Sequence, residues 1–213
     1  MKKVFLFMVM FISTHMLFAQ SEKYTAAMKK NIMLLDSAIS KGNLPEIANN
    51  FERIGDAEKT QWLPYYYASY ATVMSAFTTG DKTKVDALAD KADVLLNKAE
   101  GLAPAPNSEI FVIKSMIASA HMMVDPQTRW MQYGQAASEN ITKAKELDPT
   151  NPRPVYLEGQ SKFYTPESFG GGKAPAKELF DKAIIMFDAF KPANELYPVW
   201  GKATTLYFLS KTN

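Results

Sequence analysis

The chain has 213 residues, no cysteine, and 24 basic against 22 acidic residues. The absence of cysteine excludes disulfides, thiol nucleophiles and thiolate metal sites. Lys2 and Lys3 account for the surplus of basic residues, since without them the 24 fall to 22, equal to the acidic count. Nucleic-acid binding needs a clustered positive surface, and no run of Lys or Arg is longer than a pair, so the sequence does not predict it.

The first residues predict an export signal. Positive charge at Lys2 and Lys3 precedes an apolar run from Val4 to Phe18, and the small residue Ala19 offers a cleavage site. An uncleaved anchor is the alternative, but the run is shorter than the ~20 residues that span a bilayer, and polar residues interrupt it. We expect removal of residues 1–19. The mature protein would then be a single domain, residues 20–213, periplasmic or secreted and without a stable membrane anchor.

Apolar residues recur at intervals of three and four from residue 22 onward, which is the spacing of an amphipathic helix. Glycine, proline and Asp-Pro steps separate the periodic segments and mark helix ends. The expected helices cover residues 22–41, 44–55, 62–78, 82–102, 107–124, 130–147, 153–164, 174–190 and 198–211. They form four hairpins and one unpaired last helix, which we expect to cap the array.

An internal repeat of about 45 residues underlies these helices. Pro64, Glu109, Pro154 and Pro198 stand 45, 45 and 44 residues apart, each followed by an apolar or aromatic pair. A second pattern runs in the same phase and places small residues seven apart around a large apolar one: Ala92-x3-Leu96-x2-Ala99, Ala137-x3-Ile141-x2-Ala144 and Ala176-x3-Phe180-x2-Ala183. Alanine there lets a facing helix approach closely. The period predicts an all-α stack of helical hairpins.

The second pattern resembles that of the tetratricopeptide repeat superfamily, whose second helices carry A-x3-F-x2-A-x4-P. Gly159 falls at the glycine usual in the first helix, whereas Glu158 replaces a usual leucine, and the repeats exceed the standard 34 residues. The resemblance implies a TPR-like α-α superhelix whose first helices line a concave groove. Four stretches also resemble an uncharacterised group of exported repeat proteins of Gram-negative envelopes, which implies location and fold: residues 51–54, 62–67, 125–129 and 164–172.

Two inserted loops, residues 125–133 and 165–173, are the first candidate site, because equivalent loops of a stacked array emerge on one edge. In the first loop a cation stands beside aromatic faces, an arrangement suited to a carboxylate, a sugar or a peptide end. In the second loop glycine amides could approach an anion. The alternatives are that Arg129 pairs with Asp125 or caps a carbonyl, and that the glycines only make a turn. The candidate residues are Arg129, Trp130, Tyr133, Tyr164, Phe169, Gly170, Gly171 and Gly172.

The concave groove is the second candidate site. One stripe of a first helix would carry Arg153, Tyr156, Gln160 and Phe163, and Tyr66 and Phe111 occupy the matching position in earlier repeats. Exposed aromatic side chains in a groove would anchor a peptide or a partner helix. The alternative is a stripe that packs into the core.

The sequence predicts no enzyme and no cofactor. His121 is the one histidine after the signal, and neither a cysteine nor an HExxH pattern accompanies it. The first expectation is therefore a non-catalytic scaffold that binds an unidentified envelope protein or peptide in the groove. The alternative is a small-ligand carrier or transport accessory, with a pocket around Arg129, Tyr164 and Phe169.

Overall fold

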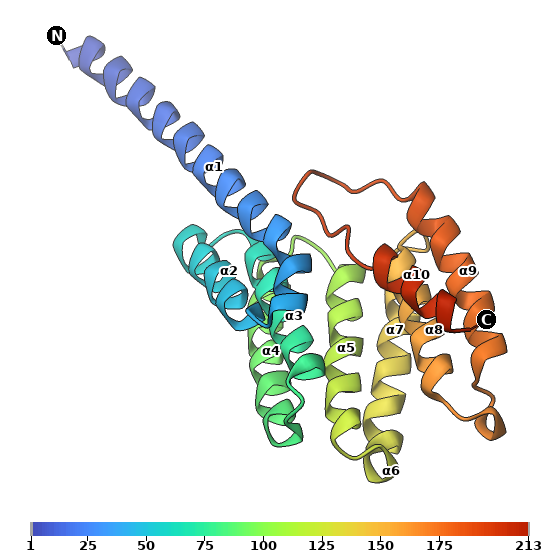
Figure 1. Cartoon of the computed structure of the whole chain (residues 1–213). Coiled ribbons are helices and arrows are strands. Elements are labelled where there is room, and N and C mark those ends of the chain that lie inside the picture. Colours follow the sequence, from blue (N-terminus) through green and yellow to red (C-terminus); the bar gives the residue numbers. More distant parts are fainter. Residues whose placement is uncertain (1, 213) are drawn as a thin grey trace.

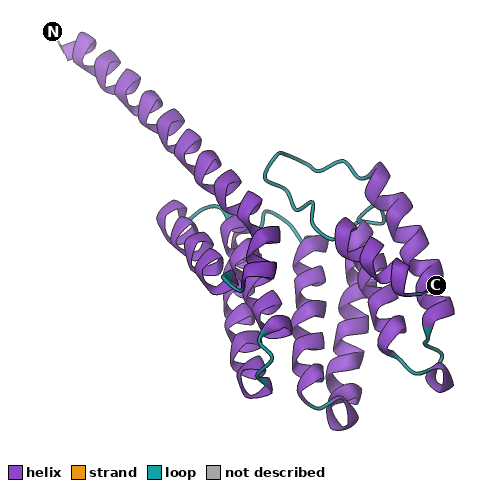
Figure 2. Ribbon diagram, in the orientation of Figure 1, coloured by secondary structure: helices purple, strands orange, loops and turns teal. Residues whose placement is uncertain are grey.

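Helical hairpins stand side by side in chain order (Figure 1). The computed structural model describes the backbone of residues 2–212 and the side chains of residues 22–212. Within that backbone every regular element is a helix or helical turn (Figure 2). The hairpins pair α1 (Lys2–Lys41) with α2 (Leu44–Glu58), α3 (Trp62–Thr78) with α4 (Lys82–Leu102), α5 (Ser108–Val124) with α7 (Gln135–Leu147), and α8 (Pro152–Tyr164) with α9 (Lys173–Ala189). A terminal helix, α10 (Lys202–Lys211), packs on α9, so the expected all-α architecture is confirmed.

Short helical turns occupy the two inserted loops. In the first loop, α6 (Pro126–Arg129) is followed by the π-helical turn η1 (Trp130–Gly134), which leads into α7. In the second, the 3-10 turn η2 (Glu167–Phe169) lies between α8 and α9. Both loops lie at the same end of the array, as the repeat predicts (Figure 1). The expected helix over 130–147 therefore begins with a π turn.

The repeat alanines lie at close helix contacts. Ala92, Ala99, Ala144, Ala176 and Ala183 are fully buried, and Ala137 is nearly so. Gly159 makes a similar contact between α8 and α9, because a Cβ added there would lie 2.8 Å from the ring of Phe180. The small residues of the motif thus set the separation of the paired helices.

Two helix ends differ from expectation. The helix predicted to stop at Gly55 continues to Glu58, and the left-handed residue that ends it is Lys59, with φ 56°. Gly55 instead admits the ring of Tyr65, since a Cβ would lie 2.8 Å from that ring. The last helix begins at Lys202 rather than 198, because Gly201 has φ 113°, which interrupts a helix.

Residues 190–201, the crossing segment, form an irregular stretch that returns from α9 toward the N-terminal hairpins (Figure 1). The Tyr67 hydroxyl donates to the Leu196 carbonyl at 2.9 Å. The ring of Trp200 stacks on Tyr70, with 4.4 Å between centroids. The crossing segment therefore ties the C-terminal helix to α3 as well as to its sequence neighbour.

The predicted signal peptide, residues 1–19, lies outside the residues whose side chains are described, and its cleavage stays a prediction. Among residues 22–212, no helix is both long enough and apolar enough to cross a membrane. From Glu22 onward α1 belongs to the hairpin array, since its Met28, Leu35 and Ala38 lie in the common core.

Candidate functional site

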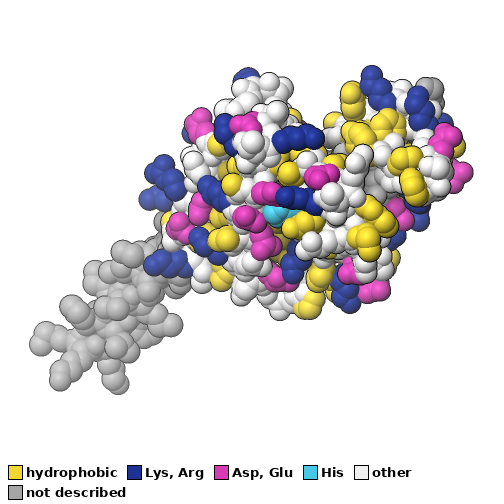
Figure 3. Space-filling view, turned by 90° about the horizontal axis from the view of Figure 1, so that it is seen from below, with side chains coloured by type: hydrophobic (Ala, Val, Ile, Leu, Met, Phe, Trp, Pro, Cys, Tyr) yellow, Lys and Arg dark blue, Asp and Glu magenta, His cyan; other side chains and the backbone are white. Residues whose placement is uncertain are grey.

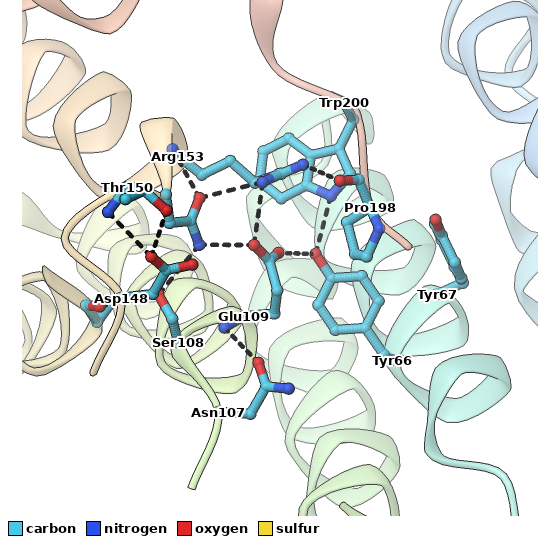
Figure 4. Close-up of polar contacts among 12 residues, drawn as sticks. Tyr66, Tyr67, Asn107, Ser108, Glu109, Asp148, Thr150, Arg153, Pro198 and Trp200 are labelled. Carbon is cyan, nitrogen blue, oxygen red and sulfur yellow. Dashed lines mark hydrogen bonds and ion pairs between the residues drawn. The ribbon is translucent and has the colours of Figure 1, made fainter. Parts of the chain in front are cut away.

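The stripe expected to line the groove contributes instead to a buried polar network at the centre of the array (Figure 4). Arg153 and Glu109 have no exposed side-chain area and form an ion pair at 3.0 Å. Glu109 also accepts hydrogen bonds from the Asn151 amide at 2.6 Å and from the Tyr66 hydroxyl at 2.7 Å. The Trp200 indole donates to the Tyr66 hydroxyl at 2.9 Å. We name these five residues the central network.

The central network is electrostatically complementary. Burial, and then the negative charge of Glu109, raise the pKa of Tyr66 well above its ordinary value, so its hydroxyl stays a neutral donor. The Arg153 guanidinium lies 5.4 Å from the ring of Trp200 and donates to the Pro198 carbonyl. A buried cation is tolerated only when it is paired and hydrogen-bonded, and Arg153 meets this through its two terminal nitrogens. These side chains hold α3, α5, α8 and the crossing segment together.

The other stripe residues do not form one continuous exposed surface. Tyr156 is buried, whereas Gln160 and Phe163 are half-buried. Phe111 is also half-buried and borders a shallow depression of about 350 Å³ beside the end of α4. The Lys114 ammonium lies 5.0 Å from the Phe111 ring. The alternative that the stripe packs into the core is therefore correct for Arg153, Tyr156 and Tyr66. It is only partly correct for Gln160, Phe163 and Phe111, which are half-buried.

Arg129 is bound within the protein. Its two terminal nitrogens donate to the Asp86 carboxylate at 2.7 and 3.0 Å, and one also donates to the His121 carbonyl at 3.1 Å. The hydrogen bond from Arg129, and then that from His121, hold the pKa of Asp86 below its ordinary value. The expected pairing of Arg129 with Asp125 is wrong. Its partner is Asp86, which comes from the preceding hairpin. Carbonyl capping by Arg129 is present.

The aromatic neighbours of Arg129 are divided. Tyr133 stacks on His121, with 4.9 Å between ring centroids, and its ring lies 6.0 Å from the Arg129 guanidinium. Trp130 is 61% exposed. In Figure 3 the histidine lies in the middle of one face, between acidic and basic side chains. Arg129 therefore already pairs with a carboxylate of the protein itself, that of Asp86.

The glycine run makes a turn. The amides of Gly170, Gly171 and Gly172 donate to the carbonyls of Glu167 at 2.9 Å, Pro166 at 3.2 Å and Lys162 at 2.9 Å. A Cβ at Gly171 would lie 2.1 Å from the Thr165 carbonyl oxygen, and Gly172 has φ 103°. Because the amides are used within the loop, the geometry favours the turn over an anion site.

Aromatic side chains gather on the surface where the end of α8 meets α10. The ring of Phe208 lies 5.5 Å from Phe163, 5.9 Å from Tyr164 and 5.6 Å from Tyr207, each in an edge-to-face arrangement. Phe208 itself is buried and stacks on Phe180 of α9 at 5.7 Å. Tyr164 and Tyr207 are 70% and 58% exposed. We name Phe163, Tyr164, Tyr207 and Phe208 the C-terminal aromatic cluster.

The C-terminal aromatic cluster has a cation beside it. Burial, and then the proximity of Tyr207, raise the pKa of Tyr164. The Lys211 ammonium lies 5.2 Å from the Tyr207 ring. In Figure 3 hydrophobic side chains gather toward the right of the view, with basic side chains beside them. Exposed apolar patches of this kind mark binding surfaces.

The sequence pointed to Tyr164 and Phe163 but missed Tyr207, Phe208 and Lys211. A signal was present, since the outer face of a terminal capping helix is normally polar, and Tyr207 departs from that rule. Phe169 is 79% exposed in the loop that follows α8, so Tyr164 and Phe169 belong to the same edge. No described contact joins them to Arg129.

These features define an all-α helical-repeat protein with an exposed aromatic surface. Its structure is similar to that of the HusA haemophore from Porphyromonas gingivalis, with a TM-score of 0.78 and 34% sequence identity. The match covers 89% of this chain and 92% of that chain. The chain therefore belongs to the family of this haemophore. No family model and no curated protein matches the chain, and the tetratricopeptide resemblance stays a prediction.

Proposed function

We propose that the protein is a carrier of haem or a closely related planar tetrapyrrole. Its kinship with a haemophore supports the small-ligand alternative raised by the sequence. The peptide scaffold has less support, because Arg153 and Tyr66 of the expected groove are buried in the central network. An exported carrier also agrees with the signal expected over residues 1–19.

The exposed rings of the C-terminal aromatic cluster are the observation that carries the proposal. Tyr164 and Tyr207 present large aromatic surfaces to solvent, and Phe208 beneath them is fixed against Phe180. Flat macrocycles gain stacking and burial on such surfaces. Because buried rings hold the exposed ones in place, little side-chain freedom is lost on binding.

We expect stacking, rather than iron ligation, to supply most of the affinity. Tyrosine can ligate haem iron through its phenolate oxygen. Burial and Tyr207 raise the pKa of Tyr164, which opposes formation of that phenolate at neutral pH. The macrocycle, common to haem and to metal-free porphyrin, would then be the recognised part.

The test is a titration of the exported, processed protein with haemin and with metal-free protoporphyrin, followed by absorbance and by quenching of intrinsic fluorescence. We expect both to bind, with dissociation constants within about tenfold of each other. Joint substitution of Tyr164→Ala and Tyr207→Ala should weaken both by about tenfold or more, since each ring contributes stacking and burial of order 1 kcal/mol.

Trp130→Ala is the matched control, because Trp130 is a similarly exposed aromatic residue (61%) outside the cluster. It should leave both affinities unchanged, and circular dichroism should show full helix content for every variant. If the wild type binds neither porphyrin, the proposed function is wrong. If Trp130→Ala or Arg129→Ala abolishes binding while the double variant does not, the carrier site lies at η1 instead.

A further inference from the structure

The two lysines of α10 have different surroundings. Lys202 forms an ion pair with Asp188 of α9. Lys211 forms no ion pair with any described side chain, and its nearest recorded partner is the ring of Tyr207, at 5.2 Å. Lys211 is also exposed. One cation of the same helix is therefore neutralised locally, and the other stands at the C-terminal aromatic cluster.

The Lys211 ammonium lies over one face of the Tyr207 ring, 5.2 Å from the ring centroid. An exposed cation–π contact is weak, about 0.5–1 kcal/mol, so it orients the ammonium without consuming its charge. Lys162, near the end of α8, donates one hydrogen bond to the Gly170 carbonyl at 3.0 Å. The Lys211 ammonium makes no hydrogen bond or ion pair with a described residue, so all three of its donors remain for a ligand.

A position in the last turn gives Lys211 a structural role as well, because cations are favoured near helix C-termini. This structural role would be the same whether or not the ligand carries a carboxylate. A ligand that stacks on the opposite face of Tyr207, in contrast, brings its own edge within reach of the long, exposed Lys211 side chain, whose ammonium would form a charge-assisted hydrogen bond with a carboxylate there.

We infer that Lys211 binds a carboxylate of the ligand and thereby selects planar aromatic molecules with acidic groups at the edge. The inference rests on the proposed binding of a tetrapyrrole at the C-terminal aromatic cluster. Stacking alone would accept neutral flat molecules equally well, so the inference narrows the ligand class to acidic ones.

The experiment compares haemin with its dimethyl ester, which keeps the macrocycle and the iron but loses both carboxylate charges. Dissociation constants are measured for the wild type, Lys211→Gln and Lys202→Gln. The two variants remove the same charge from the same helix, at sites nine residues or about 13 Å apart, beyond one screening length at physiological salt.

We expect Lys211→Gln to weaken haemin binding by about threefold to fivefold, as for an exposed ion pair, and to leave ester binding unchanged. Lys202→Gln should change neither, and Lys211→Arg should restore haemin binding. Equal weakening of haemin and ester by Lys211→Gln, or no weakening of haemin, would overturn the inference. Failure of the wild type to bind either ligand would instead refute the proposed function.

Discussion

The central network and the C-terminal aromatic cluster are built from similar parts. In the first, Arg153 lies 5.4 Å from the ring of Trp200, and in the second Lys211 lies 5.2 Å from the ring of Tyr207. The difference is that Arg153 has a carboxylate partner and no exposed surface, whereas Lys211 has solvent. A cation beside aromatic rings therefore stabilises the fold where its partners are internal and is available to a ligand where they are not.

The largest effect should come from breaking the central network. Glu109→Ala leaves Arg153 buried without its carboxylate, which typically costs about 3–5 kcal/mol. The free energy of unfolding by urea measures it. The control is Glu100→Ala, which removes the surface partner of Lys114, at 2.7 Å, and should cost below about 1 kcal/mol. Similar losses for both variants would show that burial does not distinguish these pairs.

A smaller effect is expected in the loop beside the C-terminal aromatic cluster. Gly171→Ala would place a Cβ 2.1 Å from the Thr165 carbonyl oxygen, and such overpacking typically costs about 1–3 kcal/mol. The same change at Gly101, which has open space within a helix, should stabilise by about 0.5–1 kcal/mol. Thermal unfolding midpoints compare the two, and a rise for Gly171→Ala would contradict the turn geometry.

Substituting phenylalanine for one tyrosine in each region removes the same hydroxyl group from both, so the two effects can be compared directly. Tyr66→Phe deprives Glu109 of a donor and Trp200 of an acceptor in the interior, at a cost of about 1–2 kcal/mol. Tyr207→Phe changes an exposed residue and should stay within about 0.5 kcal/mol, while porphyrin binding persists because the ring remains. Urea unfolding and the porphyrin titration are the measurements. Loss of porphyrin binding in Tyr207→Phe would indicate that the hydroxyl, not the ring, contacts the ligand.

The smallest effect concerns the surface pair of Arg129 and Asp86, whose carboxylate is 40% exposed. Because the folded state lowers the pKa of Asp86, its stabilisation is complete above the ordinary value of 3.8 and is lost as pH falls through the folded-state pKa. Asp86→Asn should therefore lower the unfolding midpoint at pH 7 and make no difference at the acid end. Asp90→Asn, at a 75% exposed carboxylate, is the control. A difference between wild type and Asp86→Asn that grows at low pH would contradict this.

Part of the central network, and the pair of Asp86 and Arg129 outside it, could have been predicted from the sequence. Tyr66 and Glu109 are 43 residues apart, Glu109 and Arg153 are 44 apart, and Asp86 and Arg129 are 43 apart. Each separation is close to one repeat, and equivalent positions of successive repeats become neighbours when hairpins stack. Opposite charges one period apart therefore carry information on pairing.

The crossing segment was out of reach. The bonds from Tyr67 to Leu196 and from Trp200 to Tyr66 span 129 and 134 residues, and no spacing rule links such positions. The segment also has no periodicity of its own, because its backbone is irregular. The expectation of a continuous helix from residue 198 was wrong. The break depends on the backbone φ of Gly201, which the sequence does not show.

By itself, the sequence determined the stacked hairpins, the buried alanines and the edge on which the inserted loops lie, because these follow from periodicities that act over one helix or one repeat. Only the tertiary structure decided which aromatic residues serve the core and which face solvent. Tyr66 and Tyr207 are the same residue type in predicted helices, yet one is fully buried and the other 58% exposed. Whether a side chain is buried depends on segments, distant in the sequence, that pack over it. No local sequence pattern indicates which segments these are.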